Sequence, residues 1–168
     1  MKHKLLSHAS FVGAFVVVGL IASGCKSSTE PGGGGCGTNG TPNNSFSAEI
    51  DGSDWTSTFT TTAGGGLLII TGADSCNPVR TFGFGLAVTT TGTYTISNSD
   101  VTGLNALLII GTNQWVAQSF VGGSGSVTIT TLNATSAVGT FNFTLIPSAG
   151  TGATGNHTVS SGSFNVKF

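Results

Sequence analysis

Residues 126–145 read SVTITTLNATSAVGTFNFTL and carry the clearest two-residue periodicity in the chain. Valine and isoleucine alternate with threonine before the polar run at 133–136, and phenylalanine and leucine alternate with polar residues after it. Successive side chains of a strand point to opposite faces, so this pattern predicts two antiparallel strands with one apolar and one hydroxyl-rich face. The residues predicted to face the core are Val127, Ile129, Phe141, Phe143 and Leu145.

The same alternation recurs toward both ends of the chain. Residues 46–50 alternate, a turn follows at 51–53, and residues 55–62 alternate again, which predicts a hairpin. Residues 81–88, TFGFGLAV, place large apolar side chains on one face and only Gly, Ala and Thr on the other, where the glycines let a neighbouring backbone approach closely. The final residues 159–168 predict a closing strand; its inward residues would be Phe164, Val166 and Phe168.

Two LLII runs, at 67–70 and 107–110, break the alternation. Continuous apolar runs of this length predict strands buried on both faces. A short amphipathic helix at 99–108 is an alternative, although Gly103 disfavours it. Together the patterns predict an all-β fold, an antiparallel β-sandwich or barrel-like fold of about eight to ten strands.

The composition limits the possible functions. Only 7% of residues are charged, against about 25% in a typical protein. Beyond Cys25 the acidic residues outnumber the basic ones, which excludes the clustered basic face that nucleic acid requires. Few side chains remain for acid-base or nucleophilic chemistry. We therefore predict a protein that is not an enzyme and that uses no cofactor.

The N-terminus has the features of an export signal. A basic start precedes the dense apolar run at 11–21, which is about half the length of a spanning helix. The following Ala22-Ser23-Gly24-Cys25 resembles the lipobox of bacterial lipoproteins, with alanine where leucine is usual. The resemblance implies removal of residues 1–24 and attachment of acyl chains such as palmitate to Cys25, which would anchor the chain to a membrane. A transmembrane anchor and a conventional signal peptide remain open.

The segment after the signal is predicted to be a tether. Residues 25–44 are rich in Gly, Ser, Thr, Pro and Asn and would reach roughly 25 Å as a flexible coil, whereas residues 45–168 have the length of a single domain. Cys36 in the tether and Cys76 in the domain form an even pair in an exported chain, which predicts a disulfide bond between them. Two free thiols or two metal ligands are the alternatives.

Three segments resemble one family. They are FSAEIDGSDWTS at 46–57, GSVTITTLNATSAVGTFNFTL at 125–145 and VSSGSFNVKF at 159–168. They are similar to a family of uncharacterised bacterial lipoproteins, known mainly from Bacteroidota, with an F-x-A-x-(I/V)-D-G-x-x-W opening and a G-T-F-x-F and G-x-F ending. The resemblance implies an envelope lipoprotein with an all-β domain and supplies no catalytic residue. Since Lys26 replaces the aspartate that commonly retains lipoproteins in the inner membrane, we expect the outer membrane, on its periplasmic or surface face.

Candidate catalytic and metal-binding residues are sparse. His157 is the one histidine beyond Cys25, and residues 122–125 only approximate the Gly-x-Ser-x-Gly motif of serine hydrolases. A hydrolase would require His157 beside a serine and an acid. Oxygen ligands for Ca²⁺ could come from four residues, but they do not form a spaced D-x-D-x-D loop, so we predict no metal site. These four residues are Asp51, Asp54, Asp74 and Asn77.

Aromatic residues suggest a second kind of site. Trp115 follows Asn113 and Gln114, whose amides could hydrogen-bond a sugar stacked on the indole, whereas Trp55 is expected in the core. The predicted function is a lipid-anchored cell-envelope protein with a non-catalytic β-sandwich domain and a structural or interaction role, with an envelope protein as its partner. A carbohydrate-binding or adhesive surface module that binds a glycan at Trp115 is the alternative, and a hydrolase is a remote one.

Overall fold

The computed structural model describes residues 44–63, 66–97 and 102–168. Over these ranges the chain forms eleven strands and no helix, which confirms the predicted all-β class and exceeds the predicted eight to ten strands. None of the described residues belongs to a helix that could cross a membrane. The predicted signal peptide and nearly all of the predicted tether lie outside the described residues.

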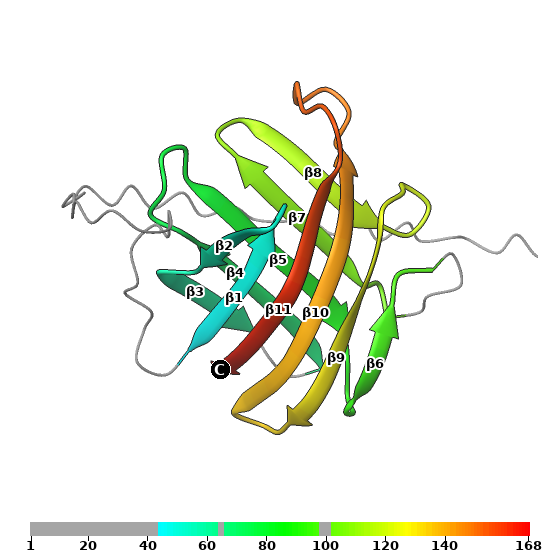
Figure 1. Cartoon of the computed structure of the whole chain (residues 1–168). Coiled ribbons are helices and arrows are strands. Elements are labelled where there is room, and N and C mark those ends of the chain that lie inside the picture. Colours follow the sequence, from blue (N-terminus) through cyan, green and yellow to red (C-terminus); the bar gives the residue numbers. More distant parts are fainter. Residues whose placement is uncertain (1–43, 64–65, 98–101) are drawn as a thin grey trace, which may run out of the picture. The chain divides into compact units, whose positions relative to one another are not determined.

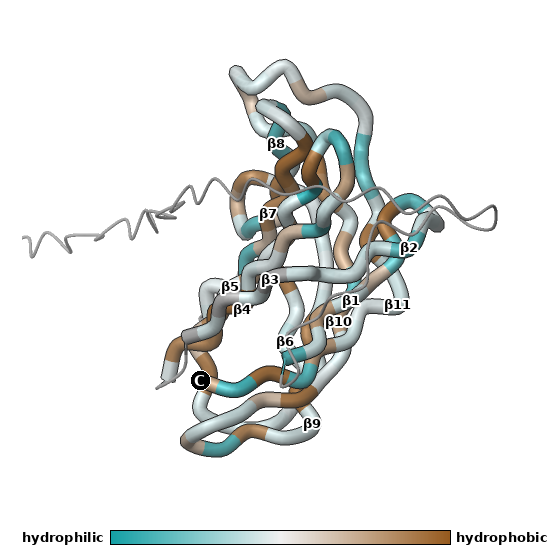
Figure 2. The backbone as a smooth tube through the Cα atoms, turned by 90° about the vertical axis from the view of Figure 1, so that its left-hand side faces the viewer, coloured by the Kyte–Doolittle hydropathy of each residue, from teal (hydrophilic) through white to brown (hydrophobic). Residues whose placement is uncertain are grey.

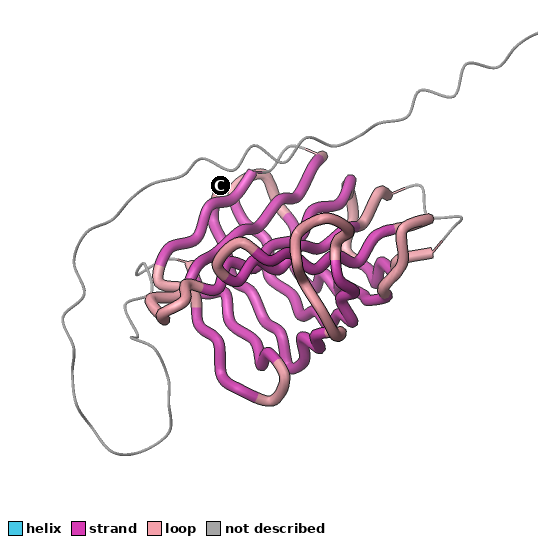
Figure 3. Tube along the Cα trace, turned by 90° about the horizontal axis from the view of Figure 1, so that it is seen from above, coloured by secondary structure: helices cyan, strands magenta, loops and turns pink. Residues whose placement is uncertain are grey.

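The strands make two antiparallel layers that share one strand (Figures 1 and 3). Sheet A has the order β2-β1-β11-β10-β9-β6, and sheet B has the order β3-β4-β5-β7-β8. The strands are β1 (Ser45–Ile50), β2 (Ser53–Thr56), β3 (Phe59–Ala63), β4 (Leu67–Ala73), β5 (Arg80–Ala87), β6 (Gly92–Thr95), β7 (Asn105–Ile110), β8 (Asn113–Gln118), β9 (Ser124–Leu132), β10 (Ser136–Pro147) and β11 (His157–Lys167).

The long strand β10 connects the layers. It pairs with β11 and β9 over most of its length, and its last residues Ile146 and Pro147 pair with Val116 and Trp115 of β8. Sheet A therefore continues into sheet B, and the strands form a nearly closed, barrel-like sandwich. The first and last strands, β1 and β11, are neighbours within sheet A.

The hairpin predicted at 46–62 is present in its first half. Asp51 and Gly52 both have positive φ, 52° and 76°, as required at the centre of a two-residue type I′ turn, and Ile50 pairs with Ser53 across it. The second half differs from the prediction, because the strand breaks after Thr56. The next strand, β3, pairs with β4 in the other sheet.

An aromatic cluster lies in the core between the two sheets. Figure 2 colours the apolar residues brown along strands of both sheets. The rings of Phe82 and Phe141, from opposite sheets, stack with centroids 5.5 Å apart, and Phe46 meets Trp55 edge to face at 5.2 Å. Such pairs contribute beyond their buried area. All five residues predicted to face the core from 126–145 are buried, as is Trp55. The aromatic members are Phe46, Trp55, Phe82, Phe84, Phe141, Phe143 and Phe164.

Glycines make room for these rings. A Cβ on Gly139 would lie 2.2 Å from the carbonyl oxygen of Thr128 and 2.6 Å from Cζ of Phe164. A Cβ on Gly162 would lie 2.4 Å from Cε2 of Phe141. Neither separation is sterically possible, so the neighbouring strands can carry phenylalanine only because these two positions carry no side chain.

The two LLII runs were predicted to be buried on both faces, and this is wrong. In β4, Leu68 and Ile70 are buried whereas Leu67 is 48% exposed, and Ile69 is half-buried. The alternation persists, but the outward positions of sheet B are themselves apolar, which hides it in the sequence. The prediction that Gly83 permits close backbone approach is confirmed, since a Cβ there would lie 2.8 Å from the carbonyl oxygen of Ile70.

Two further predictions need correction. Residues 105–110 form strand β7 rather than the end of a helix, and the first part of that predicted helix, 99–101, lies outside the described residues. Phe168 does not face the core: it follows the last strand and is 39% exposed, whereas Phe164 and Val166 are buried as predicted.

Candidate functional site

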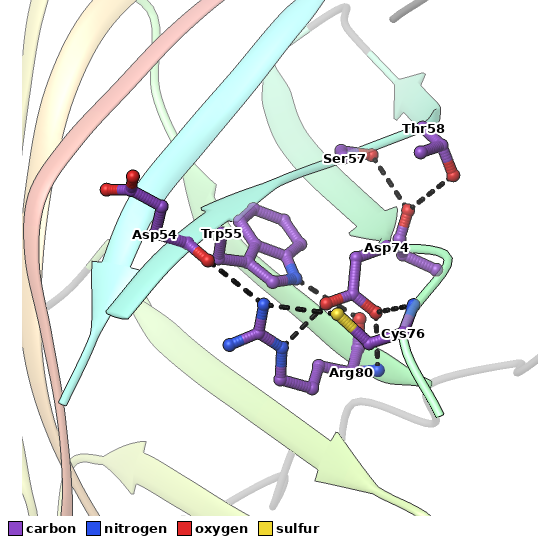
Figure 4. A network of polar contacts seen from close by, with 8 residues as sticks. Asp54, Trp55, Ser57, Thr58, Asp74, Cys76 and Arg80 are labelled. Carbon is purple, nitrogen blue, oxygen red and sulfur yellow. Dashed lines mark hydrogen bonds and ion pairs between the residues drawn. The ribbon is translucent and has the colours of Figure 1, made fainter. Parts of the chain in front are cut away.

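A network of polar contacts surrounds the loop between β4 and β5 (Figure 4). Asp74, whose side chain is 1% exposed, forms an ion pair with Arg80, with 2.6 Å between Oδ2 and Nε. Its Oδ1 accepts hydrogen bonds from the backbone N–H of Arg80 at 2.8 Å and of Cys76 at 3.2 Å. The buried carboxylate is thus paired and hydrogen-bonded, as a charge in the interior must be.

Arg80 extends the network to strand β2. Its Nη2 donates to the carbonyl oxygen of Asp54 at 3.0 Å and to Sγ of Cys76 at 3.5 Å, and its own carbonyl accepts from the Trp55 indole at 3.2 Å. These contacts fix the loop against β2 and hold Cys76 at a defined position. Because every strong contact is internal and Asp74 is closed to solvent, this network stabilises the loop rather than forming a reactive centre.

The structure places the predicted cysteines and calcium ligands in different settings. Cys76 lies in this loop, whereas Cys36 and Cys25 lie outside the described residues. Asp74 is committed to Arg80, and Asp54 is exposed on β2. The described residues include no group of three or more His, Cys, Asp and Glu side chains that could hold a metal ion.

A second polar cluster joins the β1–β2 turn to the start of β11. Asp51 Oδ2 pairs with Nδ1 of His157, and Asp51 Oδ1 accepts from the backbone N–H of Thr158 at 2.8 Å and from its hydroxyl at 3.2 Å. Partial burial raises the pKa of the Asp51 carboxyl, but the hydrogen bonds from Thr158 and His157 and the charge of His157 outweigh it, so the pKa lies below its ordinary value.

This pair supplies two of the three parts of a hydrolytic triad. His157 lies beside an acid, as a hydrolase would require, but in the described chain no serine hydroxyl is hydrogen-bonded to its ring. The ring instead lies nearly perpendicular to that of Trp115, with the two ring centroids 4.3 Å apart. A histidine oriented by an acid can accept a proton, but acyl transfer also needs a positioned nucleophile.

Trp115 is not the exposed platform predicted from its polar neighbours. It is 5% exposed, and its indole N–H donates to the carbonyl oxygen of Gly155 at 2.9 Å. Strand parity explains the difference, because Trp115 shares the inward face of β8 with buried Ala117. A sugar ring cannot stack on a buried indole, so the proposed glycan site at Trp115 is corrected to a core position.

The outer face of sheet A carries a feature that sequence reasoning did not identify. Hydroxyl residues lie directly opposite one another on six neighbouring strands, and we name this set the hydroxyl row. Its members, in order across the sheet, are Thr93, Thr128, Thr140, Ser163, Ser47 and Thr56.

Short contacts order the hydroxyl row. Thr93 and Thr128 are hydrogen-bonded through their hydroxyls at 2.9 Å, and Ser47 and Ser163 at 3.2 Å. Thr140 lies between these pairs, is exposed, and makes no side-chain hydrogen bond to another described residue. The alternating threonines in 126–145 indicate a hydroxyl-rich outer face on two strands. The alignment of hydroxyls across six strands depends on the register between strands, which the sequence does not reveal.

A hollow of about 380 Å³ opens at the end of the sandwich where the chain terminates. One wall consists of residues 66–68, at the start of β4, and residues 88–89, which follow β5. The other wall consists of residues 132–134 and Phe168. We name it the end hollow. Apolar side chains dominate its lining, and its volume is at the small end of the range for ligand pockets.

Over the described residues the chain is an all-β domain with a buried and paired Asp74, a hydroxyl-rich outer face on sheet A and an apolar hollow at one end. The chain belongs to the family described as domain of unknown function DUF6252, whose model matches residues 42–166. No curated protein and no solved structure matches the chain.

Proposed function

We propose that this chain is a lipid-anchored protein of the bacterial cell envelope, and that its β domain has a structural or interaction role without catalysis. The observation that carries the proposal is the Ala22-Ser23-Gly24-Cys25 motif after an apolar run, in a chain whose first strand among the described residues starts at Ser45. The segment between the motif and β1 is long enough to hold the domain away from a bilayer.

The chemistry of the domain supports the non-catalytic part of this proposal. The charge of the buried Asp74 is neutralised by the half-buried Arg80, and no serine hydroxyl among the described residues is hydrogen-bonded to the ring of His157 in the pair with Asp51. The remaining polar surface is mostly hydroxyl and amide, which suits contact with other molecules better than bond cleavage.

Membrane fractionation tests the anchor. Cys25→Ser should move the protein from the membrane pellet to the soluble fraction and abolish incorporation of radiolabelled palmitate. Cys76→Ser is the control for replacement of a cysteine elsewhere in the chain and should remain in the pellet. If Cys25→Ser still sediments with membranes, the lipid anchor is refuted.

Protease shaving of intact cells then separates the two faces of the outer membrane. Loss of the domain in intact cells would place it on the surface, where adhesion becomes the main role to pursue. Protection until the envelope is permeabilised would place it in the periplasm, where an envelope protein is the expected partner.

The hydroxyl row favours one second candidate function, the binding of neutral polysaccharide. Its hydroxyls lie one strand spacing apart, roughly 4.8 Å, which is close to the length of one sugar ring in a chain. The row itself carries no charge; Glu49 and Lys167 lie elsewhere on β1 and β11. The twist of the sheet suits a flexible polymer better than a flat crystalline surface.

Affinity electrophoresis through gels containing dextran or galactomannan tests this candidate. Neutral polymer should retard the native domain, and Thr140→Glu should remove the retardation by placing a charge at the centre of the row. Thr81→Glu, on the outer face of sheet B, is the matched control and should be retarded like the native domain. Retardation that survives Thr140→Glu would exclude the hydroxyl row.

A further inference from the structure

We propose that the end hollow binds the hydrocarbon chain of a fatty acid, with the carboxylate at its mouth. The hollow lies between the two sheets rather than on an outer face, so a ligand that enters it contacts both walls. Leu68 and Val88, at 1% and 5% exposure, belong to both the lining and the hydrophobic core. A chain bound there would extend the core of the sandwich outward.

The walls of the end hollow present mainly apolar side chains, and most of their hydrogen-bonding groups are bonded to one another. The Val88 N–H donates to the Gly66 carbonyl at 3.0 Å, and the Phe168 N–H donates to the Thr135 carbonyl at 3.0 Å. Oδ1 of Asn133 accepts from the backbone N–H of Thr135 at 2.9 Å and from the hydroxyls of Thr135 and Ser136 at 3.1 Å. Because these polar groups are already paired, a polar ligand would lose its hydration without compensation.

Two groups at the mouth select the carboxylate. Thr89 and Asn133 are exposed and line the hollow from opposite walls. The Thr89 hydroxyl and the Asn133 amide Nδ2 make no hydrogen bond to another described residue, whereas Oδ1 of Asn133 is held by its turn. Both available groups can donate, and a carboxylate accepts hydrogen bonds only.

Exposed apolar side chains mark the entrance. Leu67 is 48% exposed and Phe168 is 39% exposed, one on each wall. Large exposed apolar side chains gathered at a hollow are typical of a binding site. A hydrocarbon chain between them would remove apolar area from water, which is the main favourable contribution to such binding.

The hollow also lies where the chain enters the domain. Asn44 Oδ1 accepts from the backbone N–H of Lys167 at 2.7 Å, next to Phe168 at the rim, and Figure 1 shows the start of β1 near the C-terminal end. Under the proposed anchor, on which this one point rests, the entrance is within tether reach of a membrane that supplies single-chain lipids.

Fluorescent probe displacement tests the inference on the full chain carrying Cys25→Ser, so that no attached lipid competes. N-phenyl-1-naphthylamine should gain fluorescence with the protein, and dodecanoate should displace it. Dodecyltrimethylammonium has the same chain and a head that cannot accept a hydrogen bond, so it should displace the probe at least ten-fold less well. Equal displacement by the two would overturn the role of Thr89 and Asn133.

A matched pair of substitutions locates the site. Ala134→Trp fills the end hollow from an exposed turn position and should weaken probe and dodecanoate binding at least ten-fold. Ala149→Trp places the same side chain on an exposed turn at the other end of β10 and should bind like the parent. Absence of displacement by dodecanoate, or equal binding by both variants, would overturn the proposal.

A second copy of the chain is the alternative occupant. Leu67→Glu should weaken dodecanoate binding in a monomer, with Val121→Glu, a 57% exposed position elsewhere, as the control. If the parent is a dimer by light scattering and Leu67→Glu converts it to a monomer, the hollow is a dimer contact and the fatty-acid proposal is refuted. Membrane fractionation of Cys25→Ser is independent of this binding assay, so the proposed lipid anchor and the proposed fatty-acid site can be refuted separately.

Discussion

Replacing Asp74 by alanine should destabilise the domain more than any surface change. The carboxylate is closed to solvent and is the acceptor for Nε of Arg80 and for the backbone N–H groups of Arg80 and Cys76. Its removal leaves a guanidinium, 16% exposed, whose remaining partners among the described residues are the Asp54 carbonyl and the Cys76 sulfur. It also removes the acceptor of the backbone N–H groups of Cys76 and Arg80, two residues that are half-buried.

The magnitude follows from these losses. Removal of one partner of a buried ion pair costs about 3–5 kcal/mol, and an unsatisfied donor costs about 1–3 kcal/mol. The two costs are not added, because both arise from the loss of the same carboxylate. We expect a loss of about 3–5 kcal/mol in the free energy of unfolding. For a domain of this length the melting temperature falls about 4 °C per kcal/mol, so it should drop by roughly 12–20 °C.

Urea unfolding followed by tryptophan fluorescence measures the effect. Trp55 donates to the Arg80 carbonyl, so its emission reports on the network. Asp54→Ala is the control, because Arg80 bonds the backbone of Asp54 and not its carboxylate; it should cost less than about 0.5 kcal/mol. If Asp74→Ala loses no more stability than Asp54→Ala, the proposed role of the network is wrong.

Three other changes have defined outcomes. The pKa of Asp51 is lower in the folded state than its ordinary value of 3.8. Its carboxylate therefore stabilises the folded domain above that pH, and this contribution is lost as the pH falls through the folded pKa, so Asp51→Asn should reduce the loss of stability that urea unfolding measures below about pH 4. The same loss of stability in the native domain and in Asp51→Asn would contradict this. Gly139→Ala would force its Cβ against the Thr128 carbonyl and should cost at least about 1–3 kcal/mol in thermal unfolding, whereas Gly162→Ala tests the same constraint one strand away. Alkylation followed by mass measurement should find no free thiol at Cys36 or Cys76 in exported protein, and two alkylated thiols would exclude the proposed disulfide bond.

The sequence predicted the fold where local periodicity coincides with burial. Residues 126–145 alternate because one face covers the aromatic core and the other meets water, so the pattern and the structure agree. The LLII runs misled the prediction because sheet B presents leucine and isoleucine on its outer face as well. Trp115 misled it because polar residues precede it at a turn, although strand parity already placed it with Ala117.

The polar sites depend on contacts that local reasoning cannot supply. Asp51 and His157 are 106 residues apart, and only the pairing of β1 with β11 brings them together. The hydroxyl row requires the register of six strands. Asp74 and Arg80 are closer in sequence. The sequence feature that could have indicated their contact is an acid and the chain's one arginine at the two ends of the loop that connects the paired strands β4 and β5.

The pairing of β1 with β11 has a consequence for how the domain matures. Ser45 lies opposite Asn165, so the first strand has its place in the sheet only after almost the entire domain has been synthesised. Long-range pairings of this kind slow folding, because the chain must close a large loop before the contact is made. If the chain is threaded across a membrane from its N-terminus, sheet A cannot be completed until residues 157–167 have emerged on the far side. The topology would then keep the polypeptide unfolded while it crosses the membrane, and the domain would become stable only after it has crossed.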